Sequence, residues 1–328
     1  MKQVVFHVGA HRSGSSTIQG MLKRRREELA SAGLKVLVRN DLSRGVLLRQ
    51  VFAMHRGSLR ALATAWPIHR APGTAIVVSE ENLLGTMPGH RSVGFYPGYA
   101  RAIDGLRLLG RMFDVRVRWI VRRQDRFLES VYAFRVSRGE TEDFASFRAR
   151  VGQGLHWLAI ARALERSGLA DVRIGLFEDL FDAGTERRIG EFLALPGSNG
   201  WPEPLRRGNI GMRGPLLHLM RHLNREANLD VDQRRGALRA LRRLARRPGL
   251  PSARRLAGAF EAAGVPRLSP LASTALTFAA SQPAPGFDDD GRRAFLREYE
   301  PENRELVRMA LVQGRTDRWE EVSGPGGG

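Results

Sequence analysis

The chain has 328 residues, 42% of them hydrophobic, which suffices for one large or two small domains with a sizeable core and excludes a fibrous or broadly disordered protein. It contains no cysteine, which excludes disulfides and thiolate chemistry. Its net charge of +19 favours anionic partners such as nucleotides, sulfated glycans, nucleic acid or membrane surfaces, and does not choose among them.

The N-terminal region predicts a cytoplasmic protein. It enters a strand-like run at Gln3, without the basic segment, long apolar stretch and small-residue cleavage site of a signal peptide. No apolar run approaches the roughly 20 residues that a transmembrane helix needs. We therefore expect neither a signal peptide nor a transmembrane segment.

Strand-like apolar runs alternate with helical patterns over the N-terminal part of the chain. Strands are predicted at 4–8, 34–38, 75–79, 115–121 and 172–177, and helices at 16–30, 46–65, 99–109, 126–136, 155–167 and 185–193. Strands separated by helices form right-handed βαβ units, so the pattern predicts an α/β fold with a mostly parallel sheet flanked by helices. Ligands of such sheets bind at the carboxyl ends of the strands.

The C-terminal part of the chain is predicted to be helical and basic. Residues 213–263 are interpreted as a helical cap or insertion, with nine arginines and no acidic residue between Arg234 and Phe260. These arginines form either a solvated surface or a surface that binds a polyanion, and the sequence leaves both interpretations open. The remaining predictions are a loop at 279–291, a last helix at 292–312, a single domain over 1–323 and a flexible tail at 324–328.

The loop after the first strand has the composition of an anion-binding site. Gly9 and Gly14 have the spacing of the phosphate-binding pattern G-x-x-x-x-G-K-[ST]. Ser15 stands where that pattern has lysine, and the cation comes earlier, at Arg12. Backbone N–H groups at a helix start bind phosphate, and further hydrogen bonds can come from the hydroxyls of Ser13, Ser15, Ser16 and Thr17. The missing lysine weakens a kinase interpretation, although acidic residues after Val78 could hold its magnesium.

Two further segments follow predicted strands. Arg122 comes directly after the strand at 115–121, and the planar fork of arginine suits a phosphate, with Arg123 as the alternative if the register shifts by one. Glu80 and Glu81 follow the strand at 75–79, where a carboxylate could accept the proton of an acceptor hydroxyl or simply stabilise a helix N-terminus. The third candidate base is His11, whereas His7 is expected to be buried on its strand without a direct part in the chemistry.

The segment Arg12-Ser13-Gly14-Ser15-Ser16 resembles the 5′-phosphosulfate loop of sulfotransferases that use 3′-phosphoadenosine-5′-phosphosulfate (PAPS). That loop has Lys or Arg, then Ser or Thr, then Gly, then two further Ser or Thr residues, and this chain matches every position. The preceding segment, His7 to His11, is similar to bacterial members of the family. The resemblance implies a P-loop-like nucleotide-binding fold, PAPS as the co-substrate and no required metal.

The resemblance also implies roles for individual residues. Arg12 would contact the sulfuryl group and the bridging oxygen, and residues 13–17 would hold the 5′-phosphosulfate. The family binds the 3′-phosphate with an arginine at a strand end and a serine eight residues later, which correspond to Arg122 and Ser130. Glu81 takes the position of a family glutamate, and Asn209 lies in a segment similar to a loop near the cofactor.

We therefore expect a sulfotransferase that moves a sulfuryl group from PAPS to a hydroxyl or amine of an acceptor. The sequence indicates neither the acceptor nor the oligomeric state; an anionic or carbohydrate acceptor agrees with the basic C-terminal part, and nucleic acid is not expected. A P-loop small-molecule kinase is the alternative enzyme, which dependence on ATP and magnesium would identify. A non-catalytic polyanion-binding protein on this fold is the third interpretation, which tight binding without turnover would identify.

Overall fold

The computed structural model describes residues 1–38, 41, 75–89, 94–182, 185–201, 204, 212, 214–245, 249–283, 285–313 and 319. The sequence predicts one domain over 1–323, and the described part of the chain clusters into two compact units. The first unit contains the described residues of Met1–Phe127, Gly154–Asn209 and Phe295–Gly328, and the second those of Leu128–Gln153 and Ile210–Ala294. Within the described ranges, no helix is long and apolar enough to cross a membrane.

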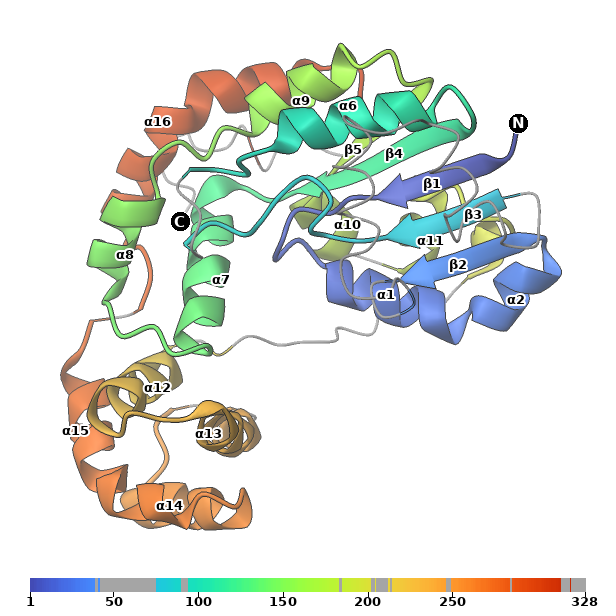
Figure 1. The fold of residues 1–328 in the computed structure, drawn as a ribbon. Helices are drawn as coiled ribbons and strands as arrows, with labels where there is room; N and C mark the ends of the chain where they lie inside the picture. The colour runs from blue at the N-terminus through green and yellow to red at the C-terminus, as the bar shows by residue number, and fades with distance from the viewer. Residues whose placement is uncertain are drawn as a thin grey trace. The chain divides into compact units, whose positions relative to one another are not determined.

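The first unit is built on an all-parallel sheet whose described strands run in the order β2-β3-β1-β4-β5-β6 (Figure 1). The strands are β1 Gln3–His7, β2 Leu34–Val38, β3 Ala75–Ser79, β4 Asp114–Val121, β5 Asp171–Leu176 and β6 Val312–Gln313. The apolar residues of the central strand, Val4, Val5 and Phe6, are all buried, as expected for a parallel sheet that is covered on both faces. The predicted α/β fold with a parallel sheet flanked by helices is confirmed.

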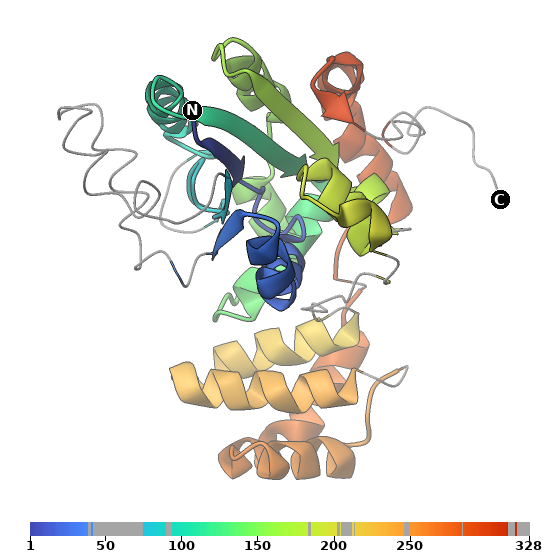
Figure 2. The same ribbon diagram turned by 90° about the vertical axis from the view of Figure 1, so that its right-hand side faces the viewer.

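Helices cover both faces of the sheet (Figure 1 and Figure 2). On one face, an apolar cluster joins Val5, Val77 and Ile120 to four helices: α1 Ser15–Arg24, α2 Arg26–Ser31, α10 Phe177–Asp182 and α11 Glu186–Phe192. On the other face, α6 Tyr99–Leu109 and α9 Trp157–Glu165 contact each other, and the rings of Trp119 and Trp157 lie 5.6 Å apart. The short helix η1 Ser198–Gly200 follows α11.

Two of the differences from the sequence prediction concern where helices break or end. The helix predicted at 16–30 is divided into α1 and α2 at Arg25, which leaves helical geometry at φ −94° and ψ 14°. At this break, Arg25 Nε lies 2.8 Å from Oε2 of buried Glu186. The Arg25 guanidinium also stacks on Trp201, with its Cζ 4.2 Å from the ring centroid. The last helix ends before the predicted boundary of 312, because Val312 instead pairs with Ile174 at the edge of the sheet.

The second unit is helical. Its elements are α8 Phe144–Val151, α12 Pro215–Glu226, α13 Val231–Leu244, α14 Ala253–Ala262, η2 Pro266–Leu271 and α15 Ala272–Ser281, and both units share α7 Gln124–Val136 and α16 Asp289–Arg308. Helix α13 begins with a capping box of Asp230 and Gln233, and Ser252 caps α14. The helical prediction is thus confirmed over the described part of 213–263. The predicted helix at 46–65 and the predicted tail lie outside the described residues.

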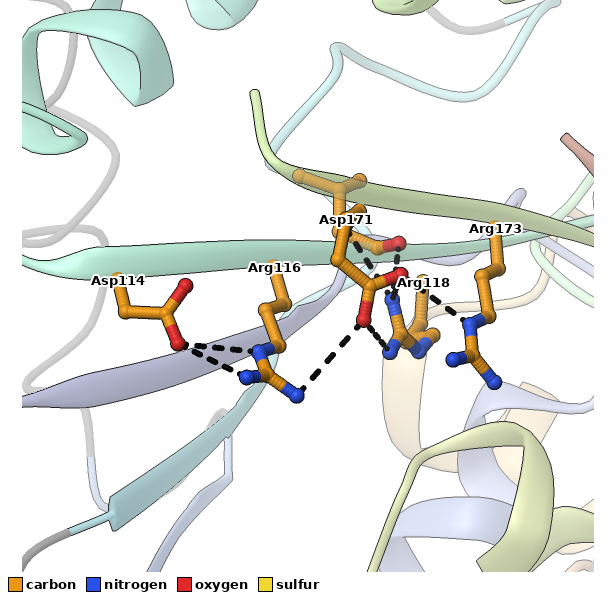
Figure 3. A network of polar contacts seen from close by, with 6 residues as sticks. Asp114, Arg116, Arg118, Asp171 and Arg173 are labelled. Carbon is orange, nitrogen blue, oxygen red and sulfur yellow. Dashed lines mark hydrogen bonds and ion pairs between the residues drawn. The ribbon is translucent and has the colours of Figure 1, made fainter.

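A charged network stabilises the amino-terminal end of β5 (Figure 3). Arg118 is fully buried on β4, and its guanidinium donates to both carboxylate oxygens of Asp171, Nη1 to Oδ1 at 3.0 Å and Nη2 to Oδ2 at 2.6 Å. Arg173 Nε lies 3.1 Å from Asp171 Oδ1, and Arg116 pairs with Asp114. Burial alone would raise the pKa of Asp171, but the hydrogen bond and charge of Arg118 outweigh it and hold that pKa below its usual value.

Candidate functional site

The carboxyl ends of three neighbouring strands meet at the loop after β1. His7, the last residue of β1, is in register with Ser79 at the end of β3 and with Arg118 of β4. Beyond the strands, Glu80 N donates to His7 O at 3.0 Å and the backbone N–H of Ala10 donates to Ile120 O at 2.9 Å. Because β1 lies where the strand order reverses, this edge is the position at which open parallel sheets bind ligands.

The conformation of this loop requires its two glycines. Gly9 and Gly14 have φ values of +44° and +84°, in the left-handed region that favours glycine. A Cβ atom on Gly9 would lie 2.5 Å from Ser15 Oγ, and one on Gly14 would lie 2.1 Å from the ring of Phe181. The loop therefore keeps its backbone close to the start of α1, whose first turn contains no acidic residue and whose helix dipole favours an anion.

Two hydroxyl groups inside this loop are buried. Ser13 is fully buried and Ser15 is 6% exposed, and neither Oγ atom has a hydrogen-bond partner among the residues that the structure describes. A buried hydroxyl without a partner costs about 1–3 kcal/mol, which an anionic oxygen bound in the loop would recover. Ser16 is exposed and Thr17 half-buried at the start of α1. The donors thus fit a phosphate or phosphosulfate group.

Arg122 lies against the same loop. Its Nη1 donates to the backbone carbonyl of Arg12 at 3.1 Å, and its guanidinium lies 4.5 Å from the centroid of the Phe177 ring. Phe177 stacks on Phe181, with centroids 4.6 Å apart, and Phe181 is the residue that packs against Gly14. Two arginines that the sequence places 110 residues apart are thereby brought together at one loop. Arg12 itself has a φ of +64°, which is uncommon for a residue with a side chain.

The alternative phosphate ligand, Arg123, has a different role. Its guanidinium forms two hydrogen bonds with Asp125, Nε to Oδ1 at 2.8 Å and Nη2 to Oδ2 at 3.1 Å, and Asp125 is fully buried. Arg123 therefore neutralises a buried carboxylate, which favours Arg122 as the phosphate ligand. Ser130 is half-buried on α7 and belongs to the second unit, so its pairing with Arg122 stays a prediction. Asn209 lies outside the described residues.

Among the candidate bases, Glu80 and His11 belong to a hydrogen-bonded chain. Oε1 of buried Glu80 accepts from Asn82 Nδ2 at 2.6 Å, so Asn82 Oδ1 is the acceptor that faces His11 Nε2 at 3.0 Å. The proton of neutral His11 consequently lies on Nε2. Its Nδ1 accepts from the hydroxyl of Tyr96 at 3.0 Å, and that hydroxyl accepts the backbone N–H of His11 at 2.8 Å. Both residues therefore act in fixing the loop, which disfavours them as the base.

Glu81 lies directly beside the loop that follows β1. A Cβ atom on Gly9 would be 3.4 Å from Glu81 Cβ, and Glu81 Oε2 accepts from Gln19 Nε2 at 2.8 Å. Nearby His7 is buried, and its Nδ1 lies 2.8 Å from Ser79 Oγ. Burial lowers the pKa of His7 to about 4, although the charge of Glu81 acts in the opposite direction, so His7 is neutral at physiological pH. The place of Glu81 against Gly9 of the loop is therefore the observation that supports Glu81 as the candidate base.

Several site residues were not found by sequence reasoning. Phe177 and Phe181 lie on α10, a helix that the sequence pattern does not predict because Phe177 extends the apolar run of β5. Glu178, on the same helix, is buried and accepts from Trp319 Nε1 at 3.0 Å, and burial raises the pKa of its carboxyl group. Tyr96 contacts His11 from 85 residues away. No spacing rule marks such partners, because only the tertiary fold brings them together.

The arginines of α13 and α14 have mixed surroundings in the second unit. Arg239 Nη2 donates to the backbone carbonyl of Ala263 at 3.1 Å, at the C-terminal end of α14, where a cation is favoured by the helix dipole. Arg235 pairs with Asp232 at 3.1 Å. Arg242, Arg254 and Arg255 are exposed. The polyanion-binding interpretation of this surface stays a prediction.

Comparison of the chain with protein-family models, with curated proteins and with solved structures gives no match. In the described ranges, no group of three or more His, Cys, Asp or Glu side chains is placed to hold a metal ion.

Proposed function

We propose that the protein is a PAPS-dependent sulfotransferase. The observation that carries this proposal is the loop between β1 and α1, which combines two left-handed glycines, the cation of Arg12 and two buried hydroxyls without partners among the described residues. A ligand group with several anionic oxygens would satisfy all of these features together. Ser15 at the lysine position of the triphosphate pattern favours a ligand other than ATP.

Different residues of the site would bind PAPS, stabilise its leaving group and accept the proton of the acceptor. PAPS, when bound, supplies an activated sulfuryl group with adenosine 3′,5′-bisphosphate as the leaving group. Ser13, Ser15 and the N–H groups that start α1 would hold its 5′ end, and Arg12 would stabilise the negative charge that develops on the departing phosphate oxygen. Glu81 would accept the proton of the acceptor hydroxyl as that oxygen attacks sulfur and the bond from sulfur to the phosphate breaks.

Arg122 would bind the 3′-phosphate. The side chain of Arg122 is already fixed by the Arg12 carbonyl and the Phe177 ring, which reduces the entropy lost on binding a phosphate. A buried polar site built for the 3′-phosphate discriminates against nucleotides that lack it, because its donors would then stay unpaired. The proposed function therefore predicts a preference for adenosine 3′,5′-bisphosphate over AMP.

Arg122→Ala should largely remove that preference. Charged hydrogen bonds of this kind contribute roughly 1.5–3 kcal/mol, about 10- to 150-fold in affinity for the bisphosphate. Calorimetric titration of both nucleotides gives the ratio of affinities, which is insensitive to a general weakening of the loop. Arg126→Ala is the matched control, because Arg126 is an exposed arginine four residues along the chain. An unchanged ratio in Arg122→Ala would remove Arg122 from the 3′-phosphate site.

A further inference from the structure

Gln19 connects α1 to the segment that carries the candidate base. It lies one helical turn after Ser15 and Ser16, on the helix whose first turn would hold the phosphosulfate. Its Nε2 donates to Glu81 Oε2 at 2.8 Å and approaches the backbone carbonyl of Ser79 at 3.4 Å. The N-terminal half of α1 therefore supplies residues of the phosphosulfate loop and also contacts Glu81, the candidate base.

The chemistry of its neighbours fixes the orientation of the Gln19 amide. The Glu81 carboxylate and the Ser79 carbonyl are both acceptors, so the nitrogen of the amide must face them and the oxygen must face away. A flipped amide would direct its oxygen at a carboxylate, and repulsion between the two oxygens would disfavour that arrangement. The contact is thus a directional, charge-assisted hydrogen bond of ordinary length.

Among the described residues, two titratable groups that interact electrostatically with Glu81 from other elements are His7 on β1 and Tyr96. Burial keeps both neutral at physiological pH, because it lowers the pKa of His7 to about 4 and raises the pKa of the Tyr96 hydroxyl. The His7 ring is engaged with Ser79 Oγ and the Tyr96 hydroxyl with His11. The Gln19 amide is consequently a donor that orients the Glu81 carboxylate without adding a charge to the site.

We propose that Gln19 is a positioning residue that holds the Glu81 carboxylate in its ionised form and at a fixed place beside the phosphosulfate loop, an inference that rests on the proposed function. A donor to a carboxylate stabilises the ionised form, which is the form that can accept a proton. It also limits rotation of the carboxylate, and a base must lie within hydrogen-bond reach of the proton that it removes. Because Gln19 lies on α1, the loop and the base are held by the same helix.

The test is the titration of the Glu81 carboxyl group in the resting protein. In protein labelled with ¹³C at the glutamate carboxyl carbons, Glu81→Gln identifies the Glu81 signal. Gln19→Met, which keeps the length of the side chain and removes the donor, should move the titration midpoint of that signal upward by about 1–2 pH units. Gln19→Glu should move it further, because it adds a like charge beside Glu81. Lys23→Met, an exposed change on the same helix, should leave the midpoint in place.

A second measurement separates this inference from the proposed function. Gln19→Met should bind adenosine 3′,5′-bisphosphate as tightly as wild type, because Gln19 holds the base and not the nucleotide. An unchanged Glu81 midpoint in both Gln19 variants would overturn the positioning role, and so would a loss of bisphosphate affinity in a folded Gln19→Met protein, which would make Gln19 a support of the loop. If wild type does not bind the bisphosphate, the proposed function fails, whatever the Glu81 titration gives.

Discussion

Arg12→Ala should lower the rate of PAPS turnover by about 10²–10³ while much of the nucleotide affinity remains. The Arg12 guanidinium would interact most strongly when charge develops on the leaving oxygen, so its loss should affect the transition state more than the bound substrate. The backbone of Arg12 keeps its contact with Arg122 in this variant, because that contact uses the carbonyl. The measurement is the formation of adenosine 3′,5′-bisphosphate from PAPS.

Arg12→Lys is the matched variant for this experiment. It restores a positive charge near the leaving oxygen, so it should recover part of the lost rate. The recovery should be incomplete because lysine lacks the planar fork of the guanidinium group. Titration with the bisphosphate should give similar affinities for both variants. Near-normal turnover in Arg12→Ala would show that Arg12 does not stabilise the transition state.

Asp171→Ala should destabilise the first unit by about 3–5 kcal/mol, because it leaves the fully buried Arg118 without its counter-charge. Asp114→Ala is the control, since it breaks an ion pair with Arg116 whose side chains are 33% and 30% exposed, and such pairs contribute about 0–1 kcal/mol. Urea unfolding followed by circular dichroism measures both. Equal effects of the two substitutions would contradict the assignment of Asp171 as the counter-charge of the buried Arg118.

A double substitution and a pH series provide two further tests of the interaction between Arg118 and Asp171. Asp171→Ala combined with Arg118→Met should recover much of the lost stability, because the buried charge is then removed as well. The folded pKa of Asp171 is depressed, so its stabilisation is present above the ordinary carboxyl pKa and is lost as pH falls through the folded value. Asp171→Ala should therefore lose less stability than wild type between neutral and acidic pH.

The fold was largely predictable because its signals are local. Buried parallel strands give continuous apolar runs, and the strands β2 and β3 have the predicted bounds. The rule that ligands bind at the carboxyl ends of parallel strands also predicted that the loop after β1, the residues after β3 and Arg122 would meet. The contact between Arg122 and Arg12 and the place of Glu81 beside Gly9 agree with that prediction.

The remaining features of the site depend on tertiary contacts that carry no local signal. The hydrogen bonds that engage His11 and Glu80 come from Tyr96 and Asn82, and the sequence alone left these two residues as candidate bases beside Glu81. The aromatic support of Arg122 comes from α10, whose first residue continues an apolar run and therefore resembles a strand. Partners of this kind can be found only when the strands and helices have been placed in space.

The most direct test of the account is a calorimetric titration of the wild-type protein with adenosine 3′,5′-bisphosphate, AMP, and ATP with and without magnesium. We expect the bisphosphate to bind without magnesium and at least about 10-fold more tightly than AMP, because the 3′-phosphate adds a charged hydrogen bond to Arg122. Magnesium-dependent binding of ATP with no preference for the bisphosphate would contradict the account and would favour a kinase.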